Sequence, residues 1–92
     1  MRLLKIYKYD IPLFYEFFIN LPEKSTILDF QVQNNAPYIW VLVDHDAPLI
    51  KVRLSIIGTF DEINDDDILA YVGTAQQPPF VWHLFMMKEI EE

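Results

Sequence analysis

The chain has 92 residues, of which 52% are hydrophobic, and it carries a formal net charge of −7 at pH 7. This length predicts one domain, because a second core would be too small to be stable alone. The absence of cysteine excludes a disulfide framework, thiolate metal sites and a cysteine nucleophile. The sequence has no apolar run of about 18 residues, so it predicts no transmembrane helix. The first residues do not resemble a signal peptide. We therefore expect a cytoplasmic protein.

The acidic charge is concentrated in the last third of the chain. Residues 1–60 carry six basic and six acidic side chains, whereas residues 61–92 carry eight acidic side chains and one basic side chain, Lys88. Binding to phosphates requires Lys and Arg, so this distribution argues against direct contact with nucleic acid. It favours attraction to a basic surface of a protein partner.

The first third of the chain predicts two strands. Residues 3–9 are apolar or aromatic apart from two lysines, which is typical of a strand whose edge is kept in water by charge. Pro12 ends this strand, because proline cannot donate to the ladder. Residues 13–21 are rich in aromatic side chains, and their pattern is compatible with a strand and with a short helical turn. We expect a strand over residues 17–21.

The centre of the predicted fold is the stretch 27–59, which contains three consecutive strands joined by turns. Apolar and polar residues alternate over 28–33 and again over 51–56, which predicts two half-buried strands. In residues 34–37, the two asparagines tolerate positive φ and the proline that follows has a fixed φ, which is typical of a hairpin turn. Residues 38–43 are apolar at every position, so a central strand with both faces covered is expected.

The last third begins with a polar loop over residues 61–67. Asn64 or Asp65 is expected to cap a single helical turn over residues 66–69, with carboxylates placed favourably at its N-terminus. Residues 70–74 predict a strand that ends at a glycine-containing bend. Residues 80–87 predict a last, strongly apolar strand.

Together these elements predict an all-β fold, or an α+β fold with one short helix. We expect a small, mainly antiparallel curled sheet, sandwich or barrel of about six to seven strands. The single β-rich domain is expected to span residues 1–88, with residues 89–92 as a frayed acidic tail. The most apolar strands need cover on both faces, which a curled sheet, a two-layer packing or a homodimer would supply.

A set of short motifs extends over most of the chain. Its members are Gln31-Val32-Gln33, Ile39-Trp40-Val41-Leu42-Val43-Asp44, Gly58-Thr59, Gly73-Thr74 and Val81-Trp82-His83-Leu84-Phe85. This set resembles a family of small uncharacterised proteins of bacteria and their phages. The resemblance implies a bacterial or phage setting, and it implies no function for any residue.

The triplet Asp44-His45-Asp46 has the composition of a metal or acid–base site. Neighbouring side chains on an extended chain point to opposite sides, so a hydrophilic turn explains the triplet better. His83 would form a two-histidine site with His45 only if the fold joined them. Metal sites usually need three or four ligands, so we expect His83 to be paired with a backbone carbonyl or to face solvent.

Nucleophilic catalysis finds no support in the sequence. Neither Ser25 nor Ser55 lies in a Gly-x-Ser-x-Gly or Ser-x-x-Lys context. Two isolated glycines build neither a phosphate-binding loop nor a dinucleotide fingerprint. We expect a protein that is not an enzyme and that uses no metal or cofactor.

The polar loop supplies the candidate partner-binding residues. These are the five carboxylates Asp61, Glu62, Asp65, Asp66 and Asp67. They lack the spacing and the central glycine of a helix–loop–helix calcium site. A solvated loop with a helix cap also explains them. Exposed aromatic side chains would add anchors to such an interface.

The leading hypothesis is a small, acidic, non-enzymatic interaction domain, encoded by a phage, that binds or inhibits a host protein. In its sharpest form the five carboxylates stand in for phosphates on a nucleic-acid-binding partner. One alternative is a homo-oligomeric structural or assembly protein. Another is a small metal-dependent hydrolase that uses His45 and His83. None of these hypotheses includes direct contact with nucleic acid or with a membrane.

Overall fold

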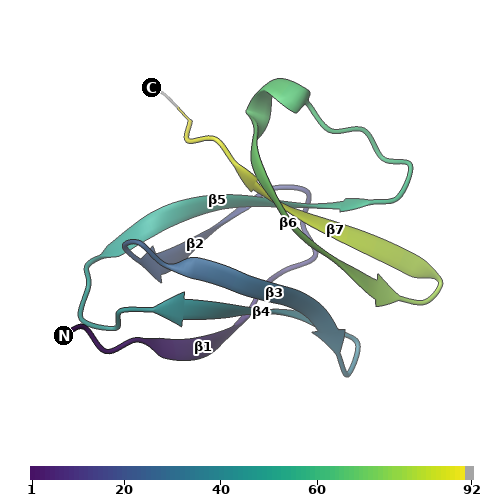
Figure 1. The fold of residues 1–92 in the computed structure, drawn as a ribbon. Helices are drawn as coiled ribbons and strands as arrows, with labels where there is room; N and C mark the ends of the chain where they lie inside the picture. Colours follow the sequence, from purple (N-terminus) through teal and green to yellow (C-terminus); the bar gives the residue numbers. More distant parts are fainter. Residues whose placement is uncertain (91–92) are drawn as a thin grey trace.

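The computed structural model describes residues 1–90 and shows a two-layer β structure (Figure 1). Seven strands and one 3₁₀ turn follow one another along the chain: β1 (Lys5–Asp10), β2 (Phe17–Pro22), β3 (Thr26–Gln33), β4 (Ala36–Val43), β5 (Leu49–Gly58), η1 (Asp65–Asp67), β6 (Ile68–Gln77) and β7 (Phe80–Met87). All strand pairs are antiparallel. The predicted all-β class is confirmed, in the form of a sandwich that does not close into a barrel.

The strands divide into a three-stranded sheet of order β1-β4-β3 and a four-stranded sheet of order β2-β5-β7-β6. The β3–β4 hairpin is confirmed: Asn34 and Asn35 form its tip with φ values of 52° and 62°, the left-handed geometry of a tight hairpin. The next connection is not a hairpin, because β4 and β5 belong to different sheets. The chain therefore folds around its core by changing sheet three times, after β1, β2 and β4.

The core lies between the inner faces of the two sheets. Ile39 and Val41 of β4 are fully buried against residues of the opposite sheet, among which Leu54 and Leu84 are also inaccessible to solvent. Each such aliphatic side chain contributes about 1.5–3 kcal/mol through burial. Burial alternates along β4, so Ile39, Val41 and Val43 form its inward row and complete the hydrophobic layer with residues of β5 and β7.

The outer face of β4 corrects one prediction. Tyr38, Trp40 and Leu42 point away from the core and are half-buried, so this strand is covered on one face and only partly on the other. A sandwich buries one face of each sheet, and β4 has no third layer above it. Its outward aromatic residues are covered in part by the side chain of Lys8.

Irregular pairing corrects two further predictions. A bulge between Ile27 and Asp29 breaks the alternation in β3, so Leu28 is 48% exposed and Ile27 packs on the core in its place. Gly73 lies within β6 rather than at its end. A Cβ atom there would lie 3.5 Å from the Cβ of Phe30, which is an ordinary van der Waals contact, so β6 packs on β3 at this position.

Other predictions are confirmed. Residues 17–21 form a strand, β7 covers residues 80–87, and Asn64 caps η1 by accepting a hydrogen bond from the Asp66 N–H. Of the predicted tail, residues 89–90 follow β7 without regular structure, and residues 91–92 lie outside the described part. No helix in the part of the chain that the structure describes is long and apolar enough to cross a membrane.

Candidate functional site

All five predicted binding residues lie in the loop between β5 and β6, which we call the acidic loop (residues 59–67). Figure 1 shows this loop, in green, projecting from the four-stranded sheet and away from β1, β3 and β4. It begins in a turn, where the Asp61 N–H donates to the Gly58 carbonyl at 3.1 Å. It ends in η1, after which the Lys88 N–H donates to the Asp67 carbonyl at 2.8 Å. Both ends of the loop are therefore held by the sheet.

The first turn of the loop depends on a glycine for reasons of space. The Gly58 N–H donates to Asp61 Oδ2 at 3.1 Å, and a Cβ atom at position 58 would lie 2.9 Å from that oxygen. No side chain can be added there unless the carboxylate moves. Gly58 thus fixes the place of the Asp61 carboxylate.

The structure divides the five carboxylates into three groups. Asp61 is tied to Gly58 at the start of the loop. Asp67 is half-buried at the other end, beside the guanidinium of Arg53. Glu62, Asp65 and Asp66 are exposed, and within residues 1–90 they form no ion pair. Three of the five carboxylates are therefore free to attract a cationic surface.

Phe60 is the feature of the loop that the sequence did not reveal. Its side chain is 100% exposed and its φ is 79°, in the left-handed region that bulky side chains rarely adopt. This conformation costs about 1–2 kcal/mol, and no buried contact offsets it. The turn closed by Asp61 holds it in place. Such strain is concentrated at functional positions in proteins.

Beside Phe60 lies an open hollow of about 500 Å³, and the aromatic residues that line it come from the acidic loop and from β7. We call it the aromatic hollow and define it by Phe60, Phe80, Trp82 and the carboxylate of Asp61, which all line it. The rings of Phe80 and Trp82 are stacked, with centroids 5.4 Å apart. The Trp82 indole N–H donates to Gln77 Oε1 at 2.9 Å, which fixes the indole plane. Two of its three aromatic residues therefore lie on β7, whereas Phe60 and Asp61 belong to the acidic loop.

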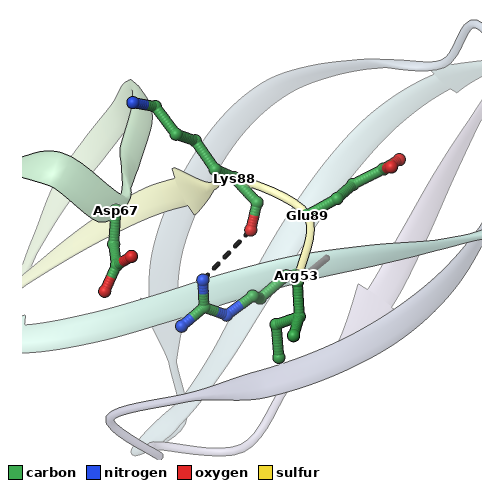
Figure 2. Close-up of a pocket in the computed structure, with 5 residues that line it drawn as sticks. Arg53, Asp67, Lys88 and Glu89 are labelled. Atoms are coloured by element: carbon green, nitrogen blue, oxygen red, sulfur yellow. Dashed lines mark hydrogen bonds between the residues drawn. The ribbon is translucent and has the colours of Figure 1, made fainter. Parts of the chain in front are cut away.

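A second open hollow, of about 550 Å³, lies at the other end of the acidic loop (Figure 2). Arg53, Asp67, Lys88, Glu89 and Ile90 line it. The Arg53 Nε–H donates to Glu16 Oε1 at 2.6 Å, and Nη1–H donates to the Lys88 carbonyl at 3.0 Å, drawn as the dashed line in Figure 2. Arg53 therefore joins β5 to the residues before β2 and after β7.

The guanidinium of this second hollow, that of Arg53, is already paired with Glu16. The hydrogen bond from Arg53 lowers the pKa of the Glu16 carboxyl below its usual value of 4.5, while partial desolvation opposes the shift. The same bond raises the pKa of Arg53, to which the charge of Asp67 also contributes. Both groups are ionised at neutral pH and bonded to each other. We conclude that this hollow is a structural junction.

The two histidines lie in separate hydrogen-bonded settings. His45 Nδ1 is 3.3 Å from Asp46 Oδ1 in the turn before β5, so the triplet forms the expected polar turn. His83 has both ring nitrogens engaged, with Thr59 Oγ1 at 2.8 Å from Nε2 and Thr74 Oγ1 at 3.0 Å from Nδ1. No group of three or more His, Asp or Glu side chains among residues 1–90 is arranged to hold a metal ion.

The serine hydroxyls are used in local structure. The Ser25 hydroxyl donates to the Pro22 carbonyl in the turn after β2. Ser55 is buried, and its hydroxyl donates to the Tyr15 carbonyl, which fixes the segment before β2 onto β5. Among residues 1–90, neither hydroxyl is hydrogen-bonded to a histidine or a carboxylate, as an activated nucleophile would be.

Comparison with known proteins gives a family and no function. No curated protein and no solved structure matches the chain. The model of one family, described as a domain of unknown function (DUF7352), matches residues 3–92. The chain belongs to this family, DUF7352.

Proposed function

We propose that the protein is a non-enzymatic interaction domain that binds a basic surface of another protein through the acidic loop and the aromatic hollow. The observation that carries this proposal is Phe60, an aromatic side chain fully exposed in a strained conformation at the start of an acidic loop. Burial in a partner would offset both the exposure and the strain. The proposed partner is a protein of a bacterial or phage-infected cell.

The charges of the loop suit this role. Glu62, Asp65 and Asp66 are exposed and unpaired within the described residues, so they add to the negative potential around Phe60. Exposed charges at the rim of an interface accelerate association and select partners, while a buried aromatic anchor supplies most of the affinity. A partner that binds nucleic acid would present a suitable basic surface.

The test is affinity capture from a bacterial lysate with elution in a rising salt gradient. The loop variant carries Glu62→Gln, Asp65→Asn and Asp66→Asn, which leaves the hydrogen bonds of Asp61 and the position of Asp67 intact. The matched control carries Asp10→Asn, Glu23→Gln and Asp46→Asn, three exposed carboxylates elsewhere that give the same change in net charge. We expect the loop variant to release the partner at markedly lower salt, by roughly tenfold in affinity or more. Equal release from both variants would refute the proposal.

Self-association is the second candidate, because β1 is an edge strand with exposed apolar side chains. Ile6 is 60% exposed on β1, and Leu3 lies exposed just before it. Unpaired edge strands are templates for pairing with another chain. The net charge of −7 opposes the approach of two copies. A dimer mass in light scattering at micromolar concentration, lost on Ile6→Lys substitution, would favour this candidate.

A further inference from the structure

Three of the aromatic surfaces that are at least partly exposed differ in whether a cation of the chain covers them. On β4, the Lys8 ammonium lies 4.0 Å from the ring centroid of Tyr38 and 5.5 Å from that of Trp40. On β2, the Lys51 ammonium lies 5.3 Å from the ring centroid of Phe18. Both contacts fall within the range of cation–π attraction.

The aromatic hollow is the third surface, and it lacks such a cation. No Lys or Arg among the described residues lies over the ring of Phe60, Phe80 or Trp82. The hollow instead contains the carboxylate of Asp61, of which Oδ2 accepts the Gly58 N–H. A negative group therefore lies beside uncovered rings, where the other two surfaces have a lysine.

We propose that the aromatic hollow binds a lysine or arginine side chain of the protein partner. The inference rests on the proposed function and names the chemical group that enters the site. The cation would lie against the rings and pair with Asp61. Neither other class of group is suited to the hollow. A neutral apolar side chain would bury the charge of Asp61 with no cation to compensate it, and an anion would be repelled by it.

The geometry of the loop supports a site that is formed before the partner arrives. Gly58 leaves room for the Asp61 carboxylate, and the bond between these two residues holds Phe60 at the rim. Gln77 fixes the indole of Trp82 from the opposite side. A site formed in advance loses less side-chain entropy when a long cationic side chain enters.

The chain provides its own control for the test, because it has two tryptophans, one in the hollow and one under Lys8. The indole N–H signals of Trp82 and Trp40 are followed by two-dimensional NMR during titration with N-acetyl-arginine amide. N-acetyl-citrulline amide, which has the same shape and no charge, is titrated at equal ionic strength. We expect a saturable shift at Trp82 with the arginine compound only, and a much smaller shift at Trp40.

Two variants test which groups form the site. Asp61→Asn keeps an oxygen for the Gly58 N–H but removes the charge, so the affinity for the arginine compound should fall severalfold. Phe60→Leu removes the ring at the rim without touching the core, and should also weaken binding severalfold. Unchanged dispersion of the amide signals shows that each variant is folded.

Several results would overturn the inference. The first two are equal shifts with the arginine and citrulline compounds, and equal shifts at the two tryptophans. The third is no shift at Trp82 up to the solubility of the arginine compound. The fourth is a Trp82 shift that depends on protein concentration alone, which would assign the hollow to a second copy.

The proposed function has separate outcomes. If Trp82 is silent while the triple loop variant still loses its partner, only the cation site is wrong. If Trp82 responds while capture is unchanged, the hollow binds cations but the loop does not select the partner.

Discussion

The two tryptophans of this protein lie in similar aromatic pairs with opposite electrostatic surroundings. Trp40 is paired with Tyr38 at 6.4 Å between ring centroids, and Trp82 with Phe80 at 5.4 Å. The first pair lies on the outer face of the three-stranded sheet under Lys8, whose ammonium also donates to Gln33 Oε1 at 2.9 Å. The second pair lines a hollow with a carboxylate and has no lysine among the described residues.

Our proposal connects this difference to binding: an aromatic surface covered by a lysine of the chain is shielded, and one beside a carboxylate is open to a partner. A lysine that lies over a ring makes a cation–π contact with its face and shields the ring from other molecules. The surfaces around Trp40 and Phe18 are shielded in this way. The aromatic hollow is the surface where a cation from outside would complete the same arrangement.

The largest effect that separates the two pairs is expected in folding stability. Trp82 packs against the core and donates to Gln77, whereas Trp40 points outward from β4. Trp82→Ala should therefore lower the free energy of unfolding by about 2–3 kcal/mol, and Trp40→Ala by about 1 kcal/mol. Urea denaturation of both variants measures this. A larger loss for Trp40→Ala would show that the two environments have been assigned wrongly.

The next effect is expected to have the opposite sign. Phe60→Gly removes a left-handed phenylalanine that buries nothing, so it should raise the free energy of unfolding by about 1 kcal/mol while it weakens binding of the arginine compound. Lys24→Gly is the matched control, because Lys24 has a φ of 63° in an exposed turn far from the hollow along the chain. It should give a similar gain in urea denaturation with normal binding. Destabilisation by Phe60→Gly would mean that the ring makes contacts that stabilise the fold.

A smaller effect is expected when the Tyr38–Trp40 pair loses its lysine and so resembles the Phe80–Trp82 pair. Lys8→Met removes the cation from Tyr38 and Trp40 and keeps an apolar stem over the rings. The stability cost should stay below about 1 kcal/mol. The indole signal of Trp40 should now respond to N-acetyl-arginine amide, with the response of Trp82 unchanged. If Trp40 stays silent in this variant, the lysine is not what shields it.

The smallest effect concerns the paired charges at Arg53. The pKa of Glu16 is lowered in the folded state by its hydrogen bond to Arg53, so the pair stabilises the fold above the unfolded value of about 4.5. That contribution is lost as the pH falls through the lowered pKa. Because Glu16 is near the surface, the effect should be modest. Urea midpoints between about pH 6 and pH 2 should fall less steeply for Glu16→Gln than for the wild type. Parallel curves would show that this bond contributes nothing.

The sequence predicted the features that depend on neighbours along the chain. Alternation located β5, aromatic density located β2, an apolar run located β7, and Asn34-Asn35 indicated a hairpin. It could not predict that β4 and β5 join different sheets, because a polar turn is compatible with both arrangements. The bulge that exposes Leu28 arises from pairing with β4, which local alternation does not report.

The candidate site was predicted in the same partial way. Charge alone located the acidic loop, because carboxylates are visible in any sequence. The exposure of Phe60 depends on a hydrogen bond between Asp61 and Gly58, and sequence gave no direct sign of it beyond an aromatic residue between turn-forming neighbours. The contrast between Trp40 and Trp82 depends on register, since Lys8 lies opposite Trp40 only when β1 pairs with β4.

The measurement that tests the central claim most directly is photo-crosslinking from position 60 in living cells. Phe60 is replaced by p-benzoylphenylalanine, which a fully exposed position accommodates, and Trp40 is replaced in a matched control. Our proposal predicts a protein adduct from position 60, attached within a segment rich in Lys and Arg, and no equivalent adduct from position 40. Adducts only between copies of this chain, or equal adducts from both positions, would contradict it.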